Sequence, residues 1–272
     1  MTMSSTPHSG HCPLPQVPAA VTEAICDRWP GRGPRWLAAA PSEIFALCQR
    51  YDGRIRQTFS ARYGLVVSVE TSHGHIVLKS TPDPDAPLQA AAARQLAALR
   101  VGPPVHEVIE SEFATSIVME QVLPGVRAIR NASIDELGEL LNVLKTAPVT
   151  LEFPPISAWL RNRLVNGAAT DLPPGVLAAS AEERAQALPV LDDLVRDESR
   201  TFIHGDISSG NVLRGPFGLR LIDPRAATGD PEYDVAVLAL KSGHQLAELA
   251  RRAAANSARV EAWAMVAVAA RV

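Results

Sequence analysis

The chain has 272 residues, of which 47% are hydrophobic and 20% are charged, and its formal net charge at pH 7 is −3. This length and composition allow one large core or two modest ones, and the acidic balance argues against nucleic-acid binding, which requires a basic surface. The first twenty residues have no basic start or apolar run, and the longest late apolar stretch, residues 262–270, is too short to cross a bilayer, so we expect no export and no membrane partner. The three cysteines, Cys12, Cys26 and Cys48, are widely spaced and indicate reduced thiols in a cytoplasmic protein.

The N-terminal part of the chain divides into a tail, a helical stretch and a strand-rich stretch. Residues 1–20 are rich in Ser, Pro and Gly, and we expect a disordered tail there. Helical spacing begins at Val21 and continues, after a Gly-Pro interruption at residues 31–34, as far as Cys48. Strands are then expected to dominate up to Val122. Residues 21–120 are therefore predicted to form a small lobe with an antiparallel sheet.

A strand, a tight turn and a second strand are predicted around the first lysine. Residues 65–71 and 76–79 are rich in β-branched side chains, and Ser72–His75 supplies the turn between them. Lys79 ends the second strand, where its charge is suited to bridging phosphate oxygens. A solvated lysine at a sheet edge is the alternative, but the chain has only three lysines, which favours a role. Residues 60–64 precede the first strand, where a loop could cover phosphates, although they lack repeated glycines.

A hinge and a helical lobe are predicted for the rest of the chain. The apolar strand 118–120 ends at residues 121–125, whose backbone groups could pair with the edge of an adenine; Glu120 and Val122 are the candidate nucleotide-binding positions. Residues 121–272 are expected to form a larger, mainly helical lobe. Its helices are expected at residues 135–145, 157–164, 181–195, 235–254 and 259–268. The predicted fold class is therefore α+β, with two lobes.

The most informative motif is His-Gly-Asp-Ile-Ser-Ser-Gly-Asn at residues 204–211, followed by Ile-Asp-Pro at residues 222–224. Residues 212–213 and 219–222 read as short strands joined by a turn at residues 214–218, and a hairpin would bring Asn211 next to Asp223. A carboxamide and a carboxylate oxygen suit magnesium, which keeps water and phosphate oxygens as further ligands. Asp206 could accept a proton from an attacking hydroxyl. A polar turn without chemistry is the alternative reading.

One competing metal chemistry is excluded by the sequence itself. Metallophosphatases need a histidine after the Asn and an Asp-x-His pair upstream, but Val212 follows Asn211 and no Asp-x-His occurs in the chain. The seven histidines are scattered, and none shows the spacing of zinc ligands.

The motif at residues 204–211 with the downstream Ile-Asp resembles the catalytic loop and metal-binding Asp of the aminoglycoside phosphotransferase superfamily, which shares the protein kinase fold. The stretches at residues 102–108, 118–125 and 229–238 resemble the streptomycin and hydroxyurea kinase branch of that superfamily. The likeness extends from about Trp36 to the end of the chain. It implies a protein kinase-like bilobal fold and a kinase that uses ATP and magnesium.

The resemblance also implies a role for each residue that matches the motif. Asp206 would be the catalytic base, Asn211 and Asp223 the magnesium ligands, and Lys79 a contact to the nucleotide phosphates. The remaining motif positions, His204, Gly205 and Asp234, would be structural: the first two would support the loop, and Asp234 would brace it as a buried carboxylate.

The chain departs from the kinase pattern at the partner of the strand lysine. Most kinases pair this lysine with a glutamate on the following helix, yet no acidic residue occurs between Asp85 and Glu107. The helix predicted at residues 88–99 is alanine-rich, with Leu88, Ala92, Leu96 and Leu99 on one face. Gln89, Asp83 or Asp85 could orient Lys79 instead.

The acceptor is the least determined part of the prediction. A cationic antibiotic of the streptomycin type requires carboxylates near Asp206, and the candidates are Asp230 and Glu232, followed by Asp192, Asp193, Glu152 and Asp197. Trp159 and Trp263 could stack on a ligand, although tryptophans at helical spacing are more often core residues. Other acceptors stay open: a peptide or nucleoside antibiotic, hydroxyurea or a metabolite alcohol. A nucleotide-binding pseudokinase is the alternative from another class.

Overall fold

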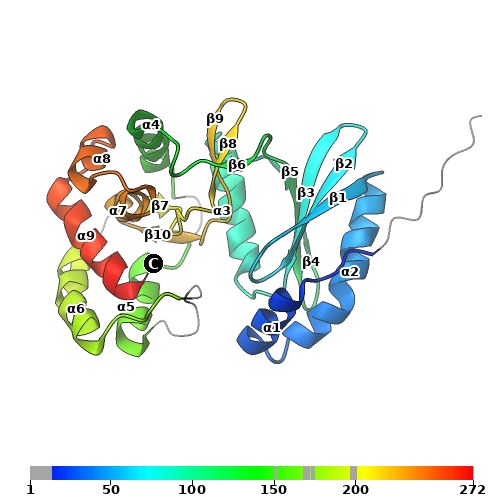
Figure 1. Ribbon diagram of the computed structural model, residues 1–272, viewed down its shortest axis with the longest axis horizontal. Coiled ribbons are helices and arrows are strands. Elements are labelled where there is room, and N and C mark those ends of the chain that lie inside the picture. The colour runs from blue at the N-terminus through cyan, green and yellow to red at the C-terminus, as the bar shows by residue number, and fades with distance from the viewer. Residues whose placement is uncertain (1–13, 150–151, 168–171, 173–174, 197–200, 272) are drawn as a thin grey trace, which may run out of the picture. The chain divides into compact units, whose positions relative to one another are not determined.

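The computed structural model describes residues 14–149, 152–167, 172, 175–196 and 201–271, and Figure 1 shows their arrangement. The chain divides into two compact units: one contains the residues up to Pro87 together with Val105–Gln121, and the other contains Leu88–Pro104 and the residues from Val122 onward. The first unit has an antiparallel five-stranded sheet and the second is mainly helical. The predicted α+β class is therefore confirmed. The predicted lobe bounds, residues 21–120 and 121–272, stay a prediction.

The sheet of the first unit has the strand order β1-β2-β3-β5-β4, and every neighbouring pair is antiparallel. The elements of this unit are α1 (Ala19–Arg28), α2 (Gly33–Arg50), β1 (Arg54–Phe59), β2 (Leu65–Thr71), β3 (Gly74–Thr81), β4 (Val105–Glu110) and β5 (Thr115–Glu120). The predicted strand pair around Lys79 is thus β2 and β3. The predicted tail lies largely outside the described residues, and its last two residues, Ala19 and Ala20, already belong to α1.

Alternation along the strands determines which face of this sheet is covered. Leu65, Val67 and Val69 of β2 are fully buried, as is Leu78 of β3, and they share one core with residues of α1 and α2. The indole N–H of Trp36, in α2, donates a hydrogen bond to the hydroxyl of Ser80 at 3.0 Å, which attaches the helix to β3. The other residues of β3 between these core positions, among them Lys79, therefore lie on the opposite face of the sheet.

The second unit holds two small sheets among helices. Its elements are α3 (Ala86–Ala98, most of which belongs to this unit), β6 (Val126–Arg127), α4 (Ile134–Lys145), α5 (Ile156–Asn166), α6 (Ala181–Arg196), β7 (Thr201–Ile203), β8 (Val212–Gly215), β9 (Gly218–Leu221), β10 (Ala227–Gly229), α7 (Pro231–Ser242), α8 (Leu246–Arg252) and α9 (Ser257–Ala270). One sheet has the order β6-β8-β9, and β7 pairs with β10 in the other. The predicted hairpin is β8–β9, with a turn confined to residues 216–217 because Gly215 pairs with Gly218.

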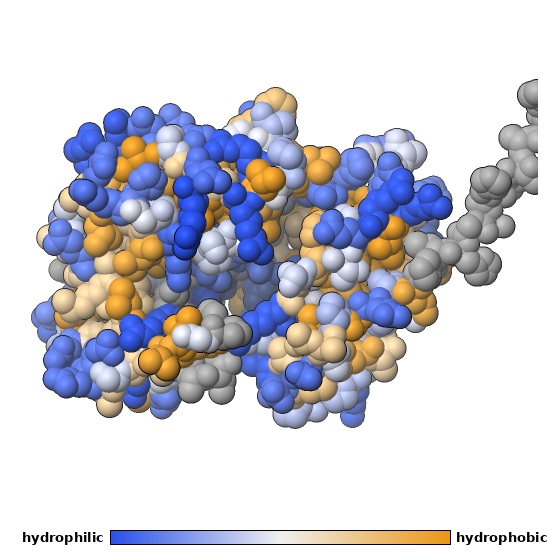
Figure 2. Space-filling view, viewed as in Figure 1, coloured by the Kyte–Doolittle hydropathy of each residue, from blue (hydrophilic) through white to orange (hydrophobic). Residues whose placement is uncertain are grey.

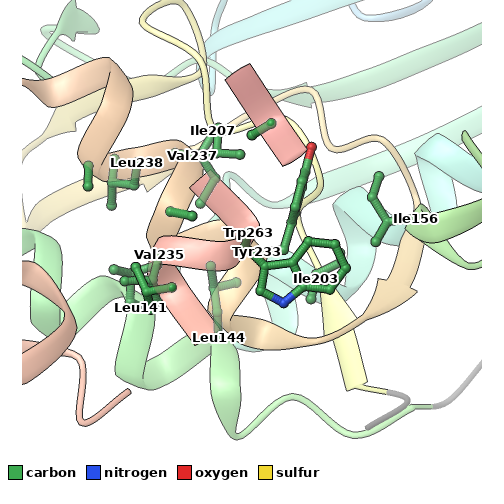
Figure 3. Packing of buried hydrophobic residues seen from close by; sticks show 14 of the residues in the cluster. Leu141, Leu144, Ile156, Ile203, Ile207, Tyr233, Val235, Val237, Leu238 and Trp263 are labelled. Atoms are coloured by element: carbon green, nitrogen blue, oxygen red, sulfur yellow. The ribbon is translucent and has the colours of Figure 1, made fainter. Parts of the chain in front are cut away.

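Helix α7 runs through the core of this unit. Its residues from Tyr233 to Ala239 are all buried, so the helix is apolar on every side, as expected for a central helix. Figure 3 shows Tyr233, Val235, Val237 and Leu238 of α7 packed among leucines of α4, Ile203 of β7 and Trp263 of α9. The rings of Tyr233 and Trp263 meet edge to face with their centroids 5.6 Å apart. Ile203, the residue before the His-Gly-Asp sequence, therefore belongs to this core.

One predicted helix is wrong: the stretch 235–254 is two helices. Helix α7 ends at Ser242 because Gly243 adopts a left-handed conformation, with φ of 82°, and its N–H returns to the carbonyl of Ala239. Helix α8 then begins at Leu246. Alanine and leucine enrichment on both sides of Gly243 hides this break, although a glycine within a helical pattern is a known helix end signal.

Helix α4 begins with a capping box. The Ser133 hydroxyl accepts a hydrogen bond from the Glu136 N–H, and the Glu136 carboxylate accepts one from the Ser133 N–H. The same carboxylate forms an ion pair with Arg214 of β8, which ties the start of α4 to the hairpin. On the face shown in Figure 2, hydrophilic residues cover much of the surface over α4 and α8, with hydrophobic residues interspersed among them.

Candidate active site

The loop between β7 and β8 contains the His-Gly-Asp motif and is held by hydrogen bonds to α7. The buried carboxylate of Asp234 accepts hydrogen bonds from the backbone N–H groups of His204, at 2.7 Å, and Gly205, at 3.0 Å. Burial raises the pKa of Asp234, while the two N–H donors and His204 oppose that shift. Gly205 has φ of 76°, a conformation that favours glycine. Asp234 thus braces the loop, in the way that the sequence predicts.

The imidazole of His204 ties the loop to the end of β9. The ring is fully buried, and its Nε2 lies 3.1 Å from the carbonyl oxygen of Ile222, while its Nδ1 accepts the backbone N–H of Asp206 at 3.2 Å. These two contacts require the neutral tautomer with its proton on Nε2. Burial lowers the pKa of His204, in agreement with a neutral ring. His204 therefore holds the backbone of Asp206 next to the residue that precedes Asp223.

Asn211 is oriented by the same loop. Its side-chain Nδ2 donates to the backbone carbonyl oxygen of Asp206 at 2.9 Å. The backbone carbonyl oxygen of Asn211 accepts the N–H of Ile222 at 3.0 Å. Because the amide nitrogen is committed to the loop, the side-chain oxygen is the atom left to bind a cation. The two backbone contacts place Asn211 beside the strand end that leads to Asp223. The hairpin therefore does what the sequence predicts: it brings its entrance and exit together.

Asp223 and Asp206 present carboxylates at this junction. Asp223 has φ of 58°, a left-handed conformation that few non-glycine residues adopt and that is common at functional sites, and its side chain is exposed. The Asp206 side chain is 35% exposed, so an incoming molecule can reach it. Burial raises the pKa of Asp206 and the nearby Asp223 charge adds to this, whereas Arg225 opposes it.

Two basic residues near Asp206, Arg225 and Lys241, were not singled out from the sequence, and Trp159 was named there only as a possible ligand contact. The Arg225 guanidinium lies 3.8 Å from the Asp206 carboxylate and 3.9 Å from the centre of the Trp159 ring. The Arg225 N–H also donates to the carbonyl of His204 at 2.9 Å. Lys241, on α7, has a pKa lowered by burial, a shift that Asp206 opposes. Only the tertiary fold brings these residues together, and no local pattern announces them.

Lys79 occupies a defined place in the sheet of the first unit. It pairs with Val66 of β2 and Ile117 of β5 and is half-buried on the face opposite α1 and α2. Asp83, a proposed partner of Lys79, accepts the N–H of Asp85 at 2.9 Å, which is a turn contact before α3. The contact that replaces the missing glutamate stays a prediction.

The loop between β1 and β2, residues 60–64, is held at close range by β3. The Thr81 hydroxyl donates to the carbonyl of Tyr63 at 2.6 Å, and the Tyr63 ring meets Trp29 edge to face at 5.5 Å. A Cβ on Gly64 would lie 2.7 Å from the Ser80 carbonyl oxygen, so only glycine fits there. A single close approach thus accounts for the only glycine of this loop.

The predicted hinge follows β5. Glu120 is the last residue of β5 and pairs with Ile76, and the N–H of Gln121 donates to the carbonyl of His75 at 2.9 Å. Gly125 has φ of 68°, and a Cβ there would lie 2.4 Å from the carbonyl oxygen of Val122. The chain therefore turns sharply between Val122 and Gly125, and Val122 is half-buried at the start of this turn.

The carboxylates predicted to contact a cationic substrate are placed elsewhere. Asp230 is 2% exposed, and its carboxylate accepts hydrogen bonds from Arg259 Nε and Trp263 Nε1, both at 2.9 Å, and from the Glu232 N–H at 3.0 Å. Glu232 is half-buried beside it, and burial raises its pKa. The geometry gives Asp230 a structural role at the start of α7 and does not support the predicted substrate contact. Trp263, likewise, is a core residue.

The remaining acidic candidates that the structure describes are ion-paired or exposed on the surface. Asp192 forms an ion pair with Arg161, and Asp193 forms one with Arg196 at 3.0 Å, both on the surface of helices. Glu152 is exposed, and Asp197 lies outside the described residues.

Asn211 and Asp223 fit a magnesium ion that also binds phosphate. The described part of the chain contains no cluster of three His, Cys, Asp or Glu side chains that could hold a metal ion. Magnesium in nucleotide sites needs only one or two carboxylates, because the phosphates and water complete its shell. The oriented Asn211 oxygen and the Asp223 carboxylate supply such a pair.

The chain belongs to the APH phosphotransferase enzyme family, whose model matches residues 56–267. This stretch contains all but the first two residues of the sheet with Lys79, the predicted hinge and the whole loop around Asp206. Family membership confirms the predicted enzyme class, and the chain is a phosphotransferase of the small-molecule kinase kind. A comparison with curated protein sequences gives no match.

Solved structures share this fold at low sequence identity. Choline kinase LicA from Streptococcus pneumoniae, in complex with AMP, is 14% identical over 84% of this chain and 85% of its own, with a TM-score of 0.61. A choline/ethanolamine kinase family protein from Mesorhizobium loti is 18% identical over 84% and 80%, with a TM-score of 0.63. A thermostable variant of aminoglycoside phosphotransferase APH(4)-Ia, in a ternary complex with ADP and hygromycin B, is 18% identical over 82% and 87%, with a TM-score of 0.58. With the family membership, these likenesses confirm the predicted protein kinase-like fold.

None of the described helices is both long enough and apolar enough to cross a bilayer.

Proposed function

We propose that the protein is an ATP- and magnesium-dependent kinase that transfers the terminal phosphoryl group of ATP to a hydroxyl of a small-molecule antibiotic. The observation that supports the proposal is a set of contacts among the loop and the hairpin: the Asn211 side chain binds the Asp206 carbonyl, and the His204 ring and the Asn211 backbone both contact Ile222, the residue before Asp223. General bases and metal ligands of phosphoryl transfer need this proximity. Such a use of ATP also fits a cytoplasmic enzyme.

Asp206 is the group that acts on the acceptor. The backbone of Asp206 is held by His204 and Asn211 while its side chain is one-third exposed, so a hydroxyl can approach the carboxylate and give up its proton as the bond to phosphorus forms. A magnesium ion held by Asn211 and Asp223 would neutralise charge on the phosphate oxygens. Lys79 would bind the phosphates, and the backbone around Glu120 and Val122 would bind the adenine.

The first candidate acceptor is a streptomycin-type aminoglycoside. This choice rests on the resemblance of residues 102–108, 118–125 and 229–238 to the streptomycin and hydroxyurea kinase branch. The solved relatives act on different alcohols, since their names include choline kinases and an aminoglycoside phosphotransferase bound to hygromycin B. Among the described candidate carboxylates, Asp230 is bound to Arg259 and Trp263, and Asp192 and Asp193 are paired with arginines, so another hydroxyl-bearing acceptor is the runner-up.

A nucleotide-binding pseudokinase is the second candidate function. The absence of an acidic residue between Asp85 and Glu107 favours it, because the following helix then has no glutamate of the kind that most kinases place there. A thermal shift with ATP and magnesium, combined with an ATP consumption assay, separates the two functions. Stabilisation by ATP without consumption, across a broad set of acceptors, would favour the pseudokinase.

The direct test uses labelled ATP, magnesium and a mixture of antibiotics that carry hydroxyl groups. Mass spectrometry of the products identifies any acceptor that gains a phosphoryl group, and fragmentation locates the modified hydroxyl. We expect phosphorylated streptomycin in the parent reaction and none with Asp206→Asn. Phosphorylation of a different compound would keep the kinase and change its acceptor, and no phosphorylated compound at all would contradict the proposal.

A further inference from the structure

A stack of three side chains links the end of the C-terminal helix to the proposed catalytic base. Trp159, on α5, has the guanidinium of Arg225 3.9 Å from its ring centre and that of Arg163 4.7 Å from it. Cationic guanidinium groups are attracted to the face of an indole ring, and a planar group loses little freedom when it lies flat there. The ring therefore restrains both arginines.

The far end of this stack is anchored. Arg163 is 6% exposed, and its Nε donates to the carbonyl of Ala270 at 2.8 Å while its Nη2 donates to that of Arg271 at 3.1 Å. These carbonyls end α9 and have no partner within the helix, so a cation is favourable beside them. Arg163 is thus a fixed base for the Trp159 ring.

The near end of the stack meets the catalytic loop at three points. The backbone N–H of Arg225 donates to the His204 carbonyl at 2.9 Å. In its side chain, Nε donates to the Gly205 carbonyl at 3.4 Å, and Nη2 lies 3.8 Å from the Asp206 carboxylate. A Cβ on Gly205 would come within 3.1 Å of the Arg225 Cβ, so the two backbones approach as closely as glycine allows. Arg225 therefore contacts every residue of the His-Gly-Asp sequence.

We propose that Arg225, clamped on the ring of Trp159, is a positioning residue that sets the direction of the Asp206 carboxylate. The proposal rests on the proposed function of Asp206 as the base. An aspartate that is one-third exposed has few contacts of its own to fix its side-chain angle, and a small misplacement of a reacting group lowers turnover strongly. The charge of Arg225 alone does not complete the role, because the contact with the Trp159 ring fixes where that charge lies.

The experiment compares variants that keep and remove the stack. Trp159→Phe keeps an aromatic face, Trp159→Leu removes it, Arg225→Lys keeps the charge without the planar group, and Arg225→Met removes both. Arg252→Met is the matched control, because Arg252 is also partly exposed and ion-paired, with Asp135 on α4. Initial rates are measured with MgATP at varied concentration, with streptomycin as acceptor and, separately, with water as acceptor, so that kcat and the KM for ATP are obtained for the folded fraction.

We expect kcat to fall by about 10- to 100-fold in Arg225→Met and Trp159→Leu, with the KM for ATP within about twofold of the parent. Trp159→Phe should recover most of the loss, Arg225→Lys part of it, and Arg252→Met should match the parent. A purely structural role would lower the amount of folded protein and leave kcat of the folded fraction unchanged. Parental kcat in Trp159→Leu, or an equal loss in Trp159→Phe and Trp159→Leu, would overturn the positioning role.

A second measurement reports the stack without relying on turnover. Protein labelled with 5-fluorotryptophan gives a fluorine signal for Trp159, which Trp159→Phe identifies by its disappearance. This signal should shift in Arg225→Met and stay in place in Arg252→Met, and an unmoved signal in Arg225→Met would contradict the clamp. A parent protein that consumes no ATP with either acceptor would overturn the proposed function and the positioning role together, whereas an active parent with an unmoved signal would overturn the clamp alone.

Discussion

Two aspartates at opposite ends of the β7–β10 region, Asp206 and Asp230, differ in almost every physical respect. Asp206 is 35% exposed and its nearest cation, Arg225, is 3.8 Å away. Asp230 is 2% exposed, and its carboxylate accepts hydrogen bonds from Arg259, Trp263 and the N–H of Glu232. Both follow a glycine in the sequence, and both were predicted to belong to the site. The Asp206 carboxylate is accessible and can accept a proton, whereas the buried Asp230 carboxylate already accepts several hydrogen bonds and stabilises the fold.

The sharpest test of this comparison is Asp206→Asn. An amide cannot accept the proton of the attacking hydroxyl, so we expect turnover to fall by a factor of about 10² to 10⁴. The shape of the side chain is kept and no tight ion pair is broken, so the melting temperature and the affinity for MgATP should remain near the parental values. Steady-state rates and a thermal shift on the same preparation check both statements. Parental turnover in this variant would show that another residue is the base.

Asp230→Ala should give the opposite pattern. It leaves the Arg259 guanidinium and the Trp263 indole N–H without their acceptor, and breaking a buried ion pair from one side costs about 3 to 5 kcal/mol of unfolding free energy. Urea denaturation measures this loss. Turnover per folded molecule should change by less than about threefold at a temperature where the variant is folded. A large loss of turnover with unchanged stability would return Asp230 to the substrate site.

Tyr233→Phe tests the region between the two aspartates. The Tyr233 hydroxyl is buried and has no hydrogen-bond partner among the described residues, and burying an unpaired hydroxyl costs free energy. Removing it should leave the ring packing against Trp263 intact and raise the unfolding free energy by about 1 kcal/mol. Urea denaturation at neutral pH checks this. A clear destabilisation would show that the hydroxyl has a bound partner, such as a buried water molecule.

Glu136→Gln gives the smallest expected effect, since Glu136 and Arg214 are each about one-third exposed and solvent screens the pair. Arg214 and the Ser133 N–H lower the pKa of Glu136 to about 2 from its ordinary 4.5. A lowered pKa in the folded state means that the ionised carboxylate stabilises above about pH 4.5 and that the contribution is lost as pH falls through about 2.

The parent should therefore exceed Glu136→Gln in stability by less than about 1 kcal/mol at neutral pH, and the difference should shrink as the pH is lowered. Urea midpoints of both proteins at several acidic pH values provide the comparison. A difference that stays constant down to about pH 2 would show that the carboxylate charge contributes nothing.

The local part of the fold and site was predictable, and the tertiary part was not. Alternation of β-branched residues identified the strands around Lys79. The glycines and proline of the turn identified the β8–β9 hairpin, which brings Asn211 next to the end of β9 that leads to Asp223. The three-residue strands β7 and β10 are too short to leave a pattern. Burial of Asp230 depends on Arg259 and Trp263 of α9, about thirty residues away, as the Arg225 clamp depends on Trp159 of α5. Sequence letters give the chemistry of a side chain, and long-range packing decides whether that chemistry is accessible.

The most direct measurement is a crystal structure grown with manganese and a non-hydrolysable ATP analogue, with anomalous data collected for the metal. The account predicts one manganese peak in contact with the Asn211 side-chain oxygen, the Asp223 carboxylate and phosphate oxygens of the nucleotide. The Asp206 carboxylate should lie beside the terminal phosphate without binding the metal through the same oxygens. A bound nucleotide whose metal lies away from both Asn211 and Asp223 would contradict the account.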